Sequence, residues 1–215
     1  MPKINITEVD LTTAGVELLS NIVYIPGFYP VSGDIVAGPH LFKNIGEFKK
    51  YFSDENENFN IPTIGNSTEL EKSIVYALAI LQMGLPIIFD IIDTKDNNDL
   101  TTSFAYQSLL ETKVKTENIL EKLKDRNNYN ISFITSGGYA SFKHFHAQMI
   151  DVASSRGDCI ALIDHEEDVS DTIDALFENV GTVFKDHDES SKFGAMFTPY
   201  CNFNFPNSWD LDSIK

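Results

Sequence analysis

The first residues of the chain alternate between apolar and polar positions. Ile4 and Ile6 and, after a one-residue slip, Val9 are separated by Asn, Thr and Glu side chains. A period of two residues is typical of a β-strand. No adjacent segment is placed to pair with this strand as a hairpin, so residues 1–20 are predicted to form an extended N-terminal β arm. Such an arm pairs at long range within its own domain, as an ordinary first strand does, or adds to the sheet of another chain.

The segment 21–66 is rich in β-forming residues and turns. An apolar run over 21–26 is predicted to be a short strand that the following Pro-Gly pair closes. A second short strand is predicted around 34–36. Ile45, Phe48 and Phe52 follow at helical spacing, which predicts a short helix.

Helical periodicity alternates with short apolar runs between residues 67 and 198. The most regular helix is predicted to begin at Ser67, a favourable N-cap residue, and to end at Gly84 before Pro86. Weaker helices are predicted at 114–124, 142–155 and 168–180. Buried strands are predicted at 87–92, 130–135, 158–163 and 193–198.

This alternation predicts the fold class. Short strands separated by amphipathic helices favour right-handed crossovers. The chain is therefore predicted to be an α/β protein with a mainly parallel or mixed sheet flanked by helices, preceded by the extended N-terminal β arm. Its segments are the arm (1–20), a β- and turn-rich segment (21–66), an α/β domain (67–200) and an irregular aromatic tail (201–215), the last with Phe203, Phe205 and Trp209.

Charge narrows the range of partners. The sequence holds 16 Lys and Arg against 32 Asp and Glu, a formal net charge of −16. Binding to nucleic acid requires a basic face that displaces counterions, and anionic membranes attract basic segments. The composition argues against both, and no apolar run approaches the roughly 20 residues that span a bilayer. We therefore expect neither a nucleic-acid ligand nor a membrane anchor.

The ends of the predicted strands are where an enzyme would place its chemistry. A turn at Ser136, Gly137 and Gly138 precedes a helix and has the form of a weak phosphate site, although no Walker or dinucleotide motif is present. A tight turn between strand and helix needs glycine in any case. Near other strand ends lie Asp90, Asp93, Asp164 and His165, of which an Asp-His pair can act as a base or a metal ligand. These residues define the alternative function, a small flavodoxin-like or hydrolase-like α/β enzyme.

Histidines and cysteines show no ligand spacing. His144 and His146 are two residues apart, which places them on different faces of a helix. Cys159 and Cys201 lie in apolar surroundings outside any metal or redox motif, which indicates buried free thiols. No metal and no cofactor are expected.

Several segments resemble one family when they are taken in order. INITEVDLTTAG and NIVYIPGF, at residues 4–15 and 21–28, are similar to the opening of contractile phage tail sheath proteins. FKNIGEFKKYF and SIVYALAILQMGLPII, at 42–52 and 73–88, resemble the helices and the strand that follow in that family. RGDCIALIDH and FGAMFTPY, at 156–165 and 193–200, resemble later sheath segments. Sheath proteins usually continue into a C-terminal domain, whereas this sequence stops at Lys215, so it is expected to be the front part of a sheath or one half of a split sheath.

The resemblance implies a structural subunit and not an enzyme. Its partners would be other sheath subunits in helical rings, the inner tail tube, and the baseplate and tail terminator proteins. The protein would be made in the host cytoplasm and would reside in the tail of the virion, or in a related cell-borne injection machine. The arm is expected to contact a neighbouring subunit by strand addition through Ile4, Ile6, Glu8 and Val9.

Overall fold

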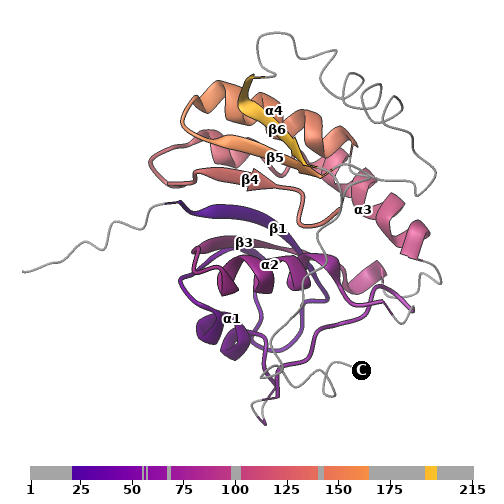
Figure 1. The fold of residues 1–215 in the computed structure, drawn as a ribbon. Coiled ribbons are helices and arrows are strands. Elements are labelled where there is room, and N and C mark those ends of the chain that lie inside the picture. The colour runs from indigo at the N-terminus through magenta and orange to yellow at the C-terminus, as the bar shows by residue number, and fades with distance from the viewer. Residues whose placement is uncertain are drawn as a thin grey trace, which may run out of the picture.

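A six-stranded sheet with helices on both faces forms the described part of the chain (Figure 1). The computed structural model describes residues 21–54, 56, 58–66, 69–97, 103–139, 143–164 and 192–197. The strands are β1 (Val23–Tyr29), β2 (Gly38–Phe42), β3 (Ile87–Asp93), β4 (Phe133–Thr135), β5 (Ile160–Asp164) and β6 (Gly194–Phe197). Their order is β2-β3-β1-β4-β5-β6, and every pair is parallel except β2–β3. The predicted α/β class is confirmed. The N-terminal arm lies outside the described residues.

The neighbouring strands β1 and β3 are apolar runs buried on both faces. β1 and β3 pair in parallel from Val23↔Ile87 to Tyr29↔Asp93, and six of the seven residues of each are buried. Parallel strands covered on both sides read as near-continuous apolar sequence, which is what these segments show. The segment 21–66 therefore supplies β1 to the middle of the same sheet that the segment 67–200 completes.

The Pro-Gly pair does not close β1, contrary to the sequence prediction. The strand passes through Pro26 and Gly27 to Tyr29. Proline is tolerated because β4 pairs with β1 only at Val23 and Tyr24, so the ladder on that side has ended before Pro26. Glycine is required because a Cβ at position 27 would lie 2.1 Å from the ring of Phe89. The second short strand is likewise displaced, to β2, which pairs antiparallel with β3 at the edge of the sheet.

The helices divide the core into two layers. On one face α1 (Ile45–Tyr51) and α2 (Lys72–Gln82) cover β1, β2 and β3. On the other face α3 (Ser103–Glu117), α4 (Lys143–Arg156) and the 3₁₀ turn η2 (Glu121–Lys124) cover β1, β4 and β5. A further 3₁₀ turn, η1 (Lys95–Asn97), follows β3. Of the helices in the described part, none has the length and apolar character of a membrane span.

Helix boundaries differ from the predicted ones at two places. The helix predicted over 114–124 begins at Ser103 and ends at Glu117, because Tyr106, Leu110 and Val114 form a buried stripe one turn apart. The helix predicted from Ser67 begins at Lys72, with Glu71 as its N-cap residue. Ser67 itself and the helix predicted over 168–180 lie outside the described residues.

Candidate functional site

The carboxyl ends of the parallel strands meet at one edge of the molecule. From β1 the chain connects to β3 on one side, and β4 occupies the other side of β1. This reversal of direction is a topological switch point, and open α/β sheets bind their ligands in the crevice outside it. The residues that follow β1 and β4 therefore border the place where a ligand would bind.

In the turn after β4, a backbone N–H donates a hydrogen bond within the turn itself. Gly137 and Gly138 have φ of 70° and 84°, a region that favours glycine. A Cβ on Gly137 would also lie 2.8 Å from the carbonyl oxygen of Pro26. The Gly137 N–H donates to Thr135 Oγ1 (3.4 Å), and this hydroxyl donates to the carbonyl of Tyr24 (3.1 Å). The turn is thus held tightly against β1, with that N–H already bonded inside the chain.

Two of the residues that the sequence marked at strand ends do come together. Ser136 Oγ donates to Asp164 Oδ2 over 3.1 Å, joining the ends of β4 and β5. Burial raises the pKa of Asp164, and the hydrogen bond from Ser136 opposes that shift. His165, the expected partner of Asp164, lies outside the described residues.

The aspartates of β3 have structural partners. Asp90 lies inside the strand and is almost fully buried, where it accepts a 2.5 Å hydrogen bond from Tyr24 Oη and forms an ion pair with Lys122. Asp93, at the end of the strand, accepts backbone hydrogen bonds from Val31 (3.0 Å) and Lys95 (2.9 Å). Both carboxylates therefore tie segments of the fold together.

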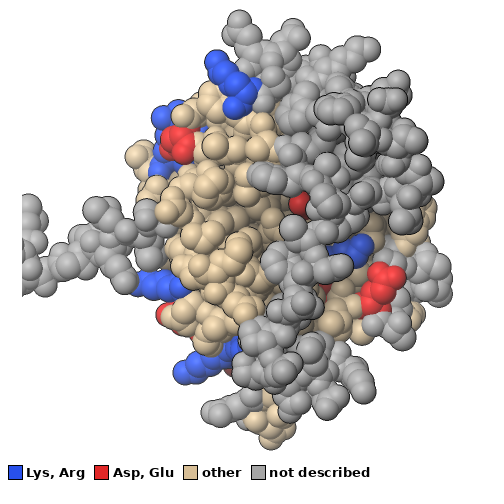
Figure 2. Space-filling view, viewed as in Figure 1, with Lys and Arg blue, Asp and Glu red and all other residues tan. Residues whose placement is uncertain are grey.

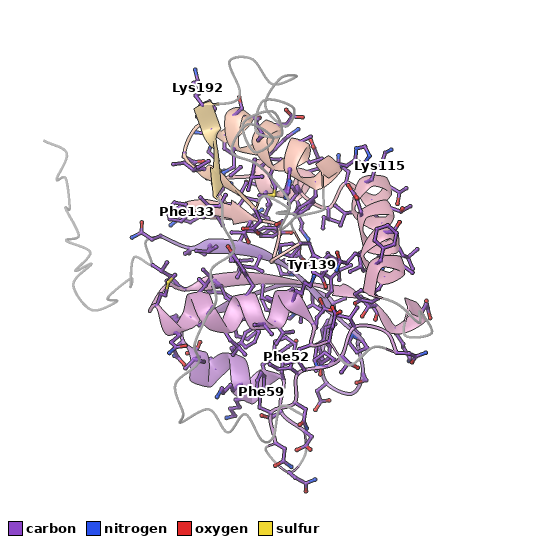
Figure 3. All side chains as sticks on the ribbon, turned by 45° about the vertical axis from the view of Figure 1, so that its right-hand side comes forward. Phe52, Phe59, Lys115, Phe133, Tyr139 and Lys192 are labelled. Atoms are coloured by element: carbon purple, nitrogen blue, oxygen red, sulfur yellow. The ribbon has the colours of Figure 1, made fainter. Side chains whose placement is uncertain are left out.

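The centre of the switch point is a buried carboxylate. Glu71, only 1% exposed, precedes α2 and accepts hydrogen bonds from the hydroxyls of Tyr139 and of Tyr106 (2.9 Å). Ser73 Oγ donates to Glu71 (3.3 Å) and accepts the backbone N–H of Phe28 (3.0 Å). One carboxylate thus joins α2, α3, the turn after β4 and the end of β1. Figure 3 shows Tyr139 where the strands approach α3, at the opposite end of the sheet from Phe133.

Burial sets the electrostatics of this cluster. It raises the pKa of Glu71 to about 7, although the hydrogen bonds from the two phenols and from Ser73 favour the ionised form. Burial also raises the pKa of Tyr139 and of Tyr106, and the Glu71 charge adds to both shifts. Glu71 can therefore gain or lose a proton near neutral pH, but the phenols fill the space in front of it.

The remaining candidates for chemistry are two histidines and a cysteine, of which two are buried and one is exposed. His146 is 2% exposed, its Nε2 has no hydrogen-bond partner among the described residues, and burial lowers its pKa to about 4. His144 is exposed, so the two histidines lie on different faces as predicted. Cys159 is a buried free thiol whose pKa burial raises. In the described part of the chain, no group of three His, Cys, Asp or Glu residues could hold a metal ion.

The expected subunit-contact residues Ile4, Ile6, Glu8 and Val9 lie outside the described residues, but a surface that could receive a strand is present. β2 borders the described sheet, with Leu41 47% exposed. Beside it is a hollow with apolar and charged walls, lined among others by Tyr29, Ile35, Leu41, Lys50 and Asp54.

Sequence reasoning did not identify Glu71, Tyr106 or Tyr139 as a cluster. The sequence pattern places Glu71 inside the first turns of the helix predicted from Ser67, where acidic residues are common. The one local signal was a glutamate directly before an apolar helix. The two tyrosines are 35 and 68 residues away in sequence, so only the fold brings them to Glu71.

No protein-family model matches the chain, and a search of curated proteins finds no significant match. Inferences about function accordingly rest on the sequence segments and on the geometry described above.

Proposed function

We propose that this chain is a structural subunit of the contractile sheath of a phage tail or of a related injection machine. The observation that carries the proposal is the order of the sheath-like segments along the fold. Residues 21–28 form β1, 42–52 join β2 to α1, and 73–88 run from α2 into β3. Residues 156–165 lead from α4 into β5, and 193–200 contain β6. The resemblance therefore follows the framework of one sheet and not a single short motif.

The packing of the switch point supports a structural role. The backbone N–H of Phe28, near the end of β1, donates to Ser73 Oγ. The backbone N–H of Gly137, in the turn after β4, donates to Thr135 Oγ1. Glu71 and its two tyrosines fill the adjoining space. Groups that would meet a ligand in an enzyme of this topology thus bind one another.

The proposed mechanism of assembly is strand addition at β2. The arm of a neighbouring subunit would pair with β2 through main-chain hydrogen bonds, with Ile4, Ile6 and Val9 against apolar surface. Lys50 in the hollow offers a partner for Glu8, while Asp34, Glu47 and Asp54 offer partners for Lys3.

In this proposal the arms connect rings of subunits around an inner tube. A flexible tether keeps neighbours linked while each subunit rotates as a rigid body during contraction. The tube, the baseplate and the tail terminator are the other partners, and the virion tail is the location.

Deletion of residues 1–13 tests the role of the arm. The shortened chain should keep its far-UV circular dichroism and its unfolding midpoint, yet form no tubes with its natural tail proteins in electron micrographs. A matched pair refines the test: Ile6→Asp should block tubes, whereas Thr7→Asp, with the same added charge on the other face of the strand, should not. Tubes of normal length from the deleted chain would refute arm exchange.

One observation favours a second candidate, a flavodoxin-like enzyme. The five parallel strands have the order β3-β1-β4-β5-β6, which is the flavodoxin-like order, and Ser136 contacts Asp164 at a strand end. Fold alone does not fix function. A flavin phosphate is held by backbone donors at and after the end of β1, where the Phe28 N–H already donates to Ser73 and the Val31 N–H to Asp93. Turnover of a substrate that Asp164→Asn abolishes without loss of folding would revive this candidate.

A further inference from the structure

The sheet is covered unevenly. β1 and β3 are buried on both faces, but β5 is buried on one. Ala161 and Ile163, which point toward α4, have no exposed surface, whereas Ile160 is 42% exposed and Leu162 is partly exposed. Side chains alternate between faces along a strand, so the exposed residues lie on the side that α2 occupies over β1 and β3.

The neighbours of β5 extend this apolar area. Phe133 of β4 is in register with Ile160, and Ala195 of β6 is in register with Leu162. Both are partly exposed. We call these four residues, Phe133, Ile160, Leu162 and Ala195, the open face. In Figure 2 the surface in front of β4 and β5, where it is not grey, is mainly tan and therefore uncharged. The net charge of the whole chain is −16.

Topology explains why the chain leaves this area open. The connection from β1 to β3 moves across the sheet toward β2 and contains α2, which packs on one face. The connections from β3 to β4 and from β4 to β5 run in the opposite direction and carry α3 and α4 on the other face. β6 continues in that second direction, so the right-handed rule predicts that its crossover also belongs to the α4 face. By this rule a cover for the open face comes from the residues before β1, from the residues after β6, or from another molecule.

The sequence after β6 has the composition of such a cover. Residues 198–215 begin at the carboxyl end of β6, the strand that borders the open face, and include Phe203, Phe205 and Trp209. Ten extended residues span about 33 Å, whereas three strands about 4.8 Å apart are about 10 Å wide. Large aromatic side chains bury more apolar surface than most others. The segment is long enough and apolar enough to cross the open face.

We propose that residues 198–215 of the same chain pack their aromatic side chains on the open face and so cover β4, β5 and β6. The segment covers the apolar residues of β4, β5 and β6 on this face, as α2 covers those of β1 and β3. Because the open face is apolar, the contact depends on shape and on apolar area. This proposal concerns the single subunit and does not depend on the sheath function.

Trp209 is the only tryptophan of the chain, so its fluorescence reports on this contact. In the folded protein it should be protected from acrylamide quenching relative to a synthetic peptide of residues 198–215. Ile160→Asp should abolish this protection, while Val36→Asp, at an exposed apolar residue outside the open face, should keep it. Both variants should keep their far-UV circular dichroism, because both positions are exposed. Quenching equal to that of the peptide in the unmodified protein would overturn the proposal.

A disulfide test separates the same chain from a second copy. Cys201 lies in the proposed cover, and Leu162→Cys places a second thiol on the open face; Cys159 is buried. Oxidation should give a link within one chain, seen as a faster monomer band on a non-reducing gel and absent from the Leu162→Cys, Cys201→Ser control. A dimer band, or protected Trp209 fluorescence that disappears on dilution, would assign the face to a second copy and overturn the proposal.

Discussion

The hydroxyl of Tyr139 donates a hydrogen bond to the carboxylate of Glu71, which joins the turn after β4 to the residue that caps α2. These residues are 68 positions apart, and both are almost fully buried. The bond occupies the place at which sheets of this topology hold a ligand. A polar group that is buried in this way stabilises the fold only while its partners remain, so the cluster can be tested through stability.

The first prediction concerns the pH dependence of stability. The pKa of Glu71 is about 7 in the folded protein against an ordinary value of 4.5, so between these pH values the folded state binds more protons than the unfolded state. This contribution is complete below pH 4.5 and is lost as pH rises through 7, about 3–4 kcal/mol in total at roughly 1.4 kcal/mol per pKa unit. Glu71→Gln should remove the dependence, so urea unfolding should show the variant gaining on the natural protein from pH 5 to pH 8.

The control for that experiment is Glu69→Gln, two residues away and exposed. It removes the same charge from the same end of α2, and it should leave the pH dependence of the natural protein in place. If Glu71→Gln and Glu69→Gln gave parallel curves, the buried carboxylate would not be the group that titrates.

The second prediction separates the two phenols from ordinary surface tyrosines. Tyr139→Phe or Tyr106→Phe removes a hydrogen-bond donor from a buried carboxylate, which should cost about 1–3 kcal/mol of unfolding free energy. The loss should be larger at pH 8 than at pH 5, because the ionised carboxylate needs its donors more. Tyr51→Phe removes a hydroxyl that contacts the Val36 N–H (3.2 Å) and His40 Nε2 (3.4 Å) outside the core, and it should change stability little at either pH. Equal losses from all three variants would contradict a special role for the cluster.

The third prediction tests why β1 contains glycine. Gly27→Ala places a methyl group 2.1 Å from the Phe89 ring and should destabilise the protein by about 1–3 kcal/mol through overpacking. Phe89→Leu alone should also destabilise it, by removing ring contacts with Phe48 and Phe52. In the double variant the smaller side chain makes room for the methyl group, so its loss should be less than the two single losses added. Strict additivity in a denaturation series would show that Gly27 is not there to accommodate Phe89.

The fourth prediction concerns the ion pair inside the sheet. Asp90 is buried with Lys122 and Tyr24 as partners, and removing one member of a buried pair leaves an uncompensated charge. The Lys122 side chain is 35% exposed, so solvent screens part of the pair, and Lys122→Met should destabilise the protein by about 1–3 kcal/mol. Lys124→Met, which loses an exposed pair with Glu121, should cost about 0–1 kcal/mol. Thermal unfolding of the two variants distinguishes them, and equal midpoints would mean that Lys122 contributes no more than a surface lysine.

The sequence was most informative where one apolar run makes one buried strand. The segments 87–92 and 158–163 were placed within two residues of β3 and β5, because strands covered by helices require continuous apolar sequence. The sequence predicts that β1 ends at Pro26, because a Pro-Gly pair usually ends a strand. No local pattern shows that β4 stops pairing with β1 before Pro26, which is why the strand can continue. The sequence predicts a helix that begins at 114, whereas α3 begins at Ser103, because its buried residues lie in otherwise polar sequence.

The candidate site depended on contacts that no local pattern contains. Ser136 and Asp164 were each identified from strand ends, and the sheet brings them to 3.1 Å because β4 and β5 are parallel neighbours. Asp90 was expected at a strand end but lies within β3, where alternation turns it toward Lys122. The Glu71 cluster joins residues from three elements, so its members could not be associated before the fold was known.

The central claim, that the chain is a subunit of a contractile sheath, is tested most directly by immunogold electron microscopy of particles from its natural source, with an antibody against the folded chain. A sheath subunit should give gold at regular spacing along the tail shaft, in extended and in contracted particles alike. Absence of gold from every particle, with the antigen soluble in the lysate, would contradict it.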